Sequence, residues 1–162
     1  MRGGALPPAL LFVALGLSLA FAPRRARVPG LLALLASVGA FSFMPIPQSW
    51  LEGVYLAFWT SVIATAASVH FVRGLALPSV APALALNAGI WASAVVRLSG
   101  APIDLLHALP FVLVLFPARW LVVRYTAVPA KVLASWVIAV AVLAAALQLM
   151  AVTPGYLPDH LE

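Results

Sequence analysis

The stretch Ala81–His107, APALALNAGIWASAVVRLSGAPIDLLH, decides how we interpret the whole chain. Four small residues and one cation recur in it at every fourth position: Ala81, Ala85, Gly89, Ser93 and Arg97. Four-residue spacing places side chains on one face of a helix. The rest of this segment, as far as Val96, consists mainly of Leu, Ile, Val, Ala and Trp. We therefore predict an apolar helix with a groove of small residues that ends in a cation.

Composition extends this interpretation to the full chain. The 162 residues are 65% hydrophobic and 8% charged, with nine basic and four acidic side chains. In soluble proteins about a quarter of the residues are charged. Thirteen charged side chains cannot cover the surface of a soluble domain of this length. We therefore predict an integral membrane protein. The Ala and Leu runs favour helices over strands.

Six apolar runs are long enough to cross a bilayer about 30 Å thick as helices. They cover approximately residues 5–22, 28–44, 50–69, 76–96, 103–123 and 132–152. We predict an all-α fold, a single transmembrane domain over residues 1–162, in which six helices form a bundle and a polar tail at 153–162 follows. Pro110 and Pro117 predict a kink in the fifth helix.

The first run has an alternative interpretation as a signal peptide, because Ala20-Phe21-Ala22 resembles a cleavage site. Pro23 would directly follow the cut, and the positive charge is heavier after the run than before it. Both features favour a retained span.

The distribution of charge predicts the topology. When the connections are numbered alternately, one side receives only Arg2 and Arg97 of the basic residues, together with all four acids. The other side receives Arg24, Arg25, Arg27, Arg73, Arg119, Arg124 and Lys131. Basic residues concentrate in cytoplasmic loops. We therefore expect both termini outside, and a bacterial inner (cytoplasmic) membrane as the location.

A polar cluster is expected at the outer ends of the helices: Arg97, Asp104, His107 and Glu52. Ionisable groups near or below the lipid head groups are costly and are functional candidates by default. A histidine beside a carboxylate could transfer protons or hold a ligand. A structural interpretation stays open, because an acid in the first turn of a helix favours the helix dipole and Arg97 could pair with Asp104.

The small-residue stripe Ala81, Ala85, Gly89 and Ser93 also has two interpretations. Small residues at this spacing let two helices approach closely. Alternatively, the stripe lines a permeation path to which other helices add polar groups. The candidates for those groups are Asn87, Ser61 and Thr65.

The seven basic residues of the other side form a predicted inner surface. Their simplest partners are anionic lipids, which attract cations near the membrane. A phosphate-bearing substrate or an acidic partner is the alternative. The net charge of +5 is thus explained by topology, and we expect no nucleic-acid partner.

Several kinds of chemistry have no motif here. The sequence contains no P-loop, no G-x-S-x-G and no H-E-x-x-H pattern. It has no cysteine, which excludes disulfides and thiolate metal sites. We predict no metal site, no cofactor and no catalytic residue.

Three functional hypotheses follow. The first is a small transporter or channel-like protein for a small solute or ion, forming a homo-oligomer. The second is an accessory or scaffolding subunit of a larger membrane complex. The third is a membrane-embedded enzyme that acts on a lipid, for which only the outer polar cluster could supply an acid–base pair.

Overall fold

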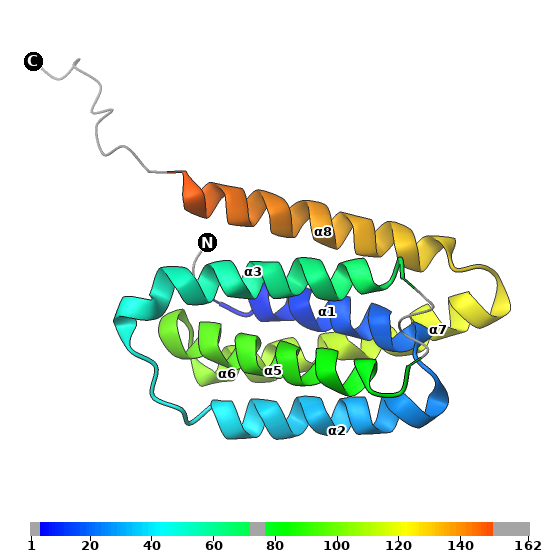
Figure 1. Ribbon diagram of the computed structural model, residues 1–162, viewed down its shortest axis with the longest axis horizontal. Helices are drawn as coiled ribbons and strands as arrows, with labels where there is room; N and C mark the ends of the chain where they lie inside the picture. Colours follow the sequence, from blue (N-terminus) through cyan, green and yellow to red (C-terminus); the bar gives the residue numbers. More distant parts are fainter. Residues whose placement is uncertain (1–3, 72–76, 151–162) are drawn as a thin grey trace, which may run out of the picture.

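The computed structural model describes residues 4–71 and 77–150, and all regular secondary structure in this part of the chain is helical (Figure 1). Residue Arg73, the tail 153–162 and the edges of two predicted spans lie outside the described residues. The helices are α1 (Leu6–Phe21), α2 (Arg24–Phe41), η1 (Gln48–Trp50), α3 (Leu51–Ser68), α5 (Val80–Ser99), α6 (Pro102–Ala108), η2 (Leu109–Val114), α7 (Leu115–Arg124) and α8 (Val128–Leu149).

These elements form six antiparallel segments, because α6, η2 and α7 follow one another along a single interrupted path (Figure 1). The interruption falls where the sequence predicts a kink. Proline lacks the amide hydrogen that continues an α-helix. Pro110 lies in the 3-10 segment η2, and Pro117 lies near the start of α7.

Prolines also mark where several helices begin. Pro7, Pro102 and Pro129 each occupy the first helical turn of their helix, where the missing amide hydrogen costs nothing. Ala22 has the extended backbone that a following proline favours, and α1 ends there. The second helix begins at Arg24, earlier than the predicted start at residue 28. Pro23 is the N-cap residue of this helix, and Pro29 lies inside the helix without ending it.

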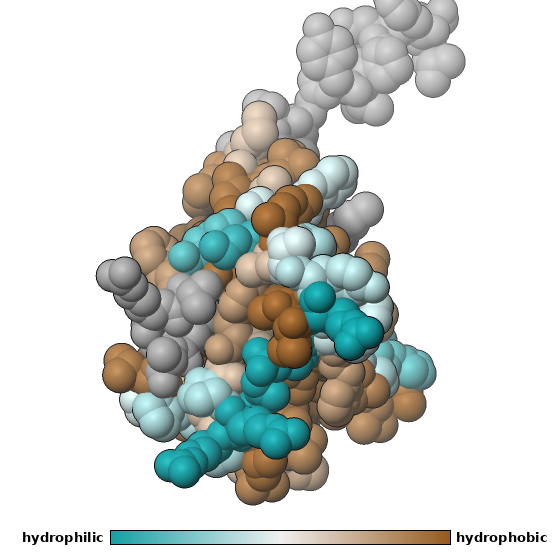
Figure 2. Space-filling view, turned by 90° about the vertical axis from the view of Figure 1, so that its right-hand side faces the viewer, coloured by the Kyte–Doolittle hydropathy of each residue, from teal (hydrophilic) through white to brown (hydrophobic). Residues whose placement is uncertain are grey.

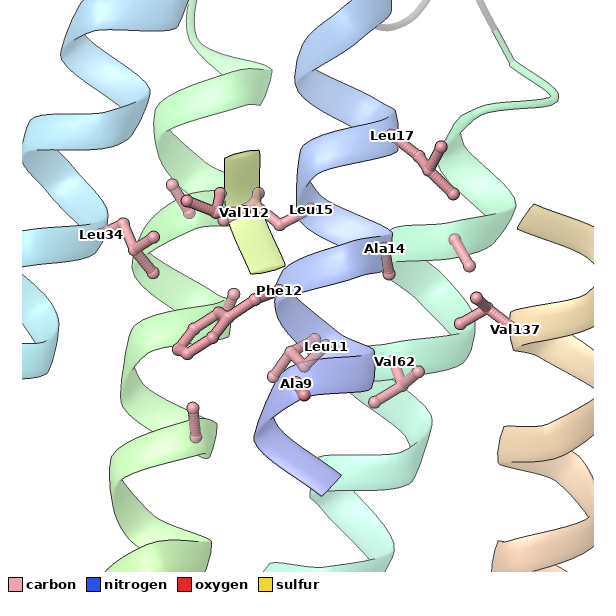
Figure 3. Packing of buried hydrophobic residues seen from close by; sticks show 14 of the residues in the cluster. Ala9, Leu11, Phe12, Ala14, Leu15, Leu17, Leu34, Val62, Val112 and Val137 are labelled. Carbon is pink, nitrogen blue, oxygen red and sulfur yellow. The ribbon is translucent and has the colours of Figure 1, made fainter. Parts of the chain in front are cut away.

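The core is organised around α1, which lies in the middle of the bundle. Its completely buried side chains include Leu11, Phe12, Ala14, Leu15 and Leu17 (Figure 3). It contacts α3, α5, η2 and α7. By contrast, α2 packs mainly against α5, and α8 mainly against α3. The two outer helices therefore lie on opposite edges of the bundle (Figure 1).

By length and composition, three helical segments can cross a membrane: Val80–Ser99, Pro102–Arg124 and Val128–Leu149. They correspond to the predicted fourth, fifth and sixth spans. The other three predicted spans form helices too, but α1 has only 16 residues, and α2 carries three arginines at its start. The structure thus shows an all-helical protein with three candidate membrane-spanning helices.

Candidate functional site: a groove and two polar ends

The small-residue stripe of α5 lies against α2. Ala81, Ala85, Gly89 and Ser93 are all buried. A Cβ atom on Gly89 would overlap Ser37 Oγ and lie 3.1 Å from the Leu34 carbonyl oxygen. The stripe is therefore a contact between two helices in this structure.

A second line of small residues, on α3, runs from the surface inward: Gly53 is exposed, Ala57 is half-buried and Ser61 is buried. Gly53, Ala57 and Ser61 follow one another at every fourth position, as the residues of the α5 stripe do. They line a shallow groove between α3 and α5, which we call the α3–α5 groove. Its other lining residues are Leu56, Thr60, Ala64, Asn87 and Trp91.

The polar groups of the α3–α5 groove form a short chain of hydrogen bonds. The Asn87 Nδ2 group donates to Ser61 Oγ, and the Trp91 Nε1 group donates to Asn87 Oδ1 at 3.0 Å. Thr60 Oγ1 donates to the carbonyl oxygen of Leu56. These hydrogen bonds join α3 to α5 near the middle of both helices. The groove therefore carries the polar amide of Asn87 at mid-depth.

Thr65 follows Ser61 by one helical turn of α3 but does not line the groove. Its side chain is completely buried, and its Oγ1 has no hydrogen-bond partner within residues 4–71 and 77–150. Its backbone carbonyl accepts a hydrogen bond from Ser18 Oγ of α1, which also bonds to Ser68 Oγ. Thr65 therefore belongs to the contact between α1 and α3.

The structure does not bring the outer polar residues together into one network. Asp104 Oδ2 accepts a hydrogen bond from the Ala101 amide at 2.9 Å and caps α6, whereas Arg97 is exposed and forms no ion pair with it. His107 is exposed in the last turn of α6. An acid at the N-terminus and a histidine near the C-terminus both suit the helix dipole. The structural interpretation accounts for these positions.

Glu52 lies on another helix, in the first turn of α3. It lines a small depression together with Tyr55 of α3 and Gln148 of α8. The Tyr55 hydroxyl is also hydrogen-bonded to Ser99 Oγ at the end of α5. Glu52 therefore belongs to the junction between α3 and α8.

The opposite end of the bundle carries the basic residues. Arg24, Arg25 and Arg124 are exposed, and Arg27, Arg119 and Lys131 are half-buried. Figure 2 views the molecule from this end and shows hydrophilic residues gathered between apolar surfaces. The two carboxylates of the described residues, Glu52 and Asp104, both lie at the far end.

Within the described residues, no group of three or more His, Cys, Asp or Glu side chains could hold a metal ion. The line of Gly53, Ala57 and Ser61 has the same spacing as the α5 stripe, and this spacing is the signal from which the sequence could have predicted it. The sequence identified Asn87 and Ser61 as candidates. It did not predict that Asn87 bonds to both Ser61 and Trp91.

Neither the known protein families, nor the curated proteins, nor the solved structures contain a match to this chain. Its function is therefore inferred from the geometry of the groove and of the two polar ends.

Proposed function

We propose that all six helical segments cross a membrane. The exposed surface supports this, because large apolar side chains are exposed on the outer helices, including Leu32 and Leu35 of α2, Phe116 and Trp120 of α7, and Trp136, Leu143 and Leu147 of α8. A soluble monomer rarely exposes a continuous apolar surface of this extent. In a bilayer these side chains contact lipid.

Within this membrane bundle, we propose that the chain acts as an accessory or scaffolding subunit that binds a transmembrane helix of a partner in the α3–α5 groove. The observation that carries this proposal is the position of α1. Its completely buried apolar side chains occupy the middle of the bundle, where an axial path through a single copy would run. The α3–α5 groove, by contrast, lies open on the side of the bundle.

The chemistry of the α3–α5 groove fits a helix. Gly53 has open space where a Cβ atom would be, and Ala57 and Ser61 are also small, so a second backbone can approach closely. Asn87 is half-buried and keeps a polar amide at mid-depth. Such a group is costly in lipid and favours a protein neighbour that can hydrogen-bond to it.

Site-specific photo-crosslinking in native membranes tests this function. A benzophenone amino acid replaces Leu56, at the rim of the groove, and in a control Leu143, on the exposed face of α8. We expect a discrete protein adduct from position 56 and none from position 143. The additional change Ala57→Leu fills the groove and should abolish the adduct. Lipid adducts alone from both positions would contradict the proposal.

A transporter or channel-like function is the second candidate, and the polar lining by Thr60, Ser61 and Asn87 favours it. In this case the path would form between copies that face one another across the groove. The chain has no cysteine, so Ala57→Cys introduces a unique probe. Reaction of this thiol with a small water-soluble reagent in intact membranes, and a crosslink from position 56 to a second copy, would favour transport over scaffolding.

A further inference from the structure

Two arginines that are far apart in the sequence meet at the C-terminal end of α1. Arg27 donates from Nε (3.0 Å) and Nη2 (2.8 Å) to the carbonyl oxygen of Ala22. Arg119 of α7 donates from Nη1 to the carbonyl oxygen of Ala20 at 3.3 Å. The last carbonyls of a helix attract cations, so α1 fixes both guanidinium groups in place.

Arg24 lies on the same side as Arg27, one turn earlier in α2, whereas Arg25 does not. Burial lowers the pKa of the Arg27 guanidinium from its ordinary value, and the charges of Arg119 and Arg24 lower it further. Three positive charges therefore repel one another here. No carboxylate of the described residues is close enough to compensate them, because Glu52 and Asp104 are at the other end of the bundle.

Each guanidinium has five N–H donors. Arg27 uses two of them on Ala22, and Arg119 uses one on Ala20. The remaining N–H donors belong to the guanidinium groups of Arg27 and Arg119, which are half-buried and held in place by α1. Arg24, which is exposed, adds a third positive charge. Guanidinium groups bind phosphate oxygens through paired, charge-assisted hydrogen bonds.

We propose that Arg24, Arg27 and Arg119 form a specific binding site for a phosphate group at the basic end of the bundle. The phosphate is either that of an anionic lipid head group or a free phosphate ion. In both cases it neutralises a cluster that no carboxylate of the described chain neutralises, and it bridges α2 to α7. The site is independent of the α3–α5 groove and of the function proposed for it.

The test compares two adjacent arginines. Arg24→Gln and Arg25→Gln remove the same charge from the same helix, but only the first belongs to the proposed site. Full-length protein is purified in detergent, and native mass spectrometry compares its binding of phosphatidylglycerol with that of phosphatidylcholine. In parallel, its melting temperature is measured with inorganic phosphate against chloride at constant ionic strength.

We expect Arg24→Gln to weaken binding of the phosphate probe roughly tenfold and Arg25→Gln to weaken it by less than about twofold, because of these two residues only Arg24 donates to the ligand. Arg119→Lys keeps the positive charge but loses the paired donors of the guanidinium group. It should therefore weaken binding about as much as Arg24→Gln does. If Arg119→Lys fails to fold, the Arg24 and Arg25 pair decides alone.

The two probes separate the two sources of phosphate. Binding of phosphatidylglycerol without an effect of inorganic phosphate identifies a lipid site, and stabilisation by inorganic phosphate without lipid identifies a site for the free ion. Equal losses in Arg24→Gln and Arg25→Gln would show a diffuse surface charge and overturn the proposal. So would the failure of both probes to bind the wild-type protein.

Discussion

At the scale of single residues, Gly16 allows the central helix to make a close contact with another backbone. A Cβ atom at this position would lie 2.8 Å from the Val112 carbonyl oxygen and 3.1 Å from the Leu115 amide nitrogen. Both atoms belong to the backbone, so neither can rotate away. The approach of α1 to the interrupted segment η2 therefore depends on the absence of a side chain at Gly16.

Gly16→Ala should destabilise the fold by about 1–3 kcal/mol, because overpacking against backbone forces a shift of the whole segment. Gly39→Ala is the matched control, since nothing lies within 4 Å of a Cβ atom there. Alanine favours a helix over glycine by up to about 1 kcal/mol, so the control should be neutral or slightly stabilised. Thermal unfolding of both variants in one detergent measures the difference. Equal melting temperatures would show that η2 moves freely relative to α1.

At the scale of elements, the pairing of α2 with α5 shows how two helices share limited space. Gly89 of α5 faces Ser37 of α2, and Ser93 Oγ lies 3.5 Å from the Val38 carbonyl oxygen. Ser37 Oγ itself donates to the carbonyl oxygen of Leu34 in its own helix. The Ser37 hydroxyl is therefore satisfied within its own helix, and the long hydrogen bond from Ser93 adds to the close packing that holds the pair together.

This contact predicts a compensating pair of substitutions. Gly89→Ala should destabilise the protein because its new Cβ atom overlaps the Ser37 side chain. Ser37→Gly removes that side chain and should relieve the overlap in the double variant. We expect a coupling of about 1 kcal/mol in a double-mutant cycle of unfolding free energies, since residues in direct contact are non-additive. Additive losses would mean that α2 and α5 separate easily to accommodate the methyl group.

The same elements show what the sequence could and could not predict. Helical character and the six segments follow from apolar run length, and the interruption at Pro110 follows from proline chemistry. The spacing of small residues predicts a face on α5 and an equal one on α3. It cannot say which face is covered, because that depends on the position of α2, a long-range property of the packing. The sequence therefore pointed to Gly89, which is buried, and not to Gly53, which is open.

The polar residues give a similar lesson. The first-turn position of Asp104 predicted its role at the start of α6, because a helix terminus is a local feature. The meeting of Arg27 with Arg119 could not be predicted, since it depends on where α7 crosses the end of α1. Charge counts identify both arginines as inner residues without placing them side by side.

At the scale of the whole molecule, the six antiparallel segments lead to one question, which is how many of them cross the membrane. If only α5, the α6–α7 segment and α8 cross, everything before Val80 lies on one side. If all six cross, the side alternates at each turn. The turns at Arg27 and near Pro47 therefore distinguish the two cases, because they lie on one side in a three-span protein and on opposite sides in a six-span protein.

We expect six crossings, since the basic residues alternate with the turns along the full chain. Reporter fusions after Arg27, Gly74 and Arg124 should report the cytoplasm, and fusions after Pro47, Gly100 and Glu162 should report the outside. The full-length chain provides an independent measurement, because it has no cysteine of its own. An impermeant thiol reagent should label Ser49→Cys in intact cells and Thr126→Cys only after the membrane is opened. Both positions are exposed, and they lie at opposite ends of the bundle, in η1 and between α7 and α8. A cytoplasmic signal after Pro47, together with protection of Ser49→Cys in intact cells, would leave α1, α2 and α3 on the inner side. In that case the apolar faces of these helices would need a protein or the membrane surface to cover them.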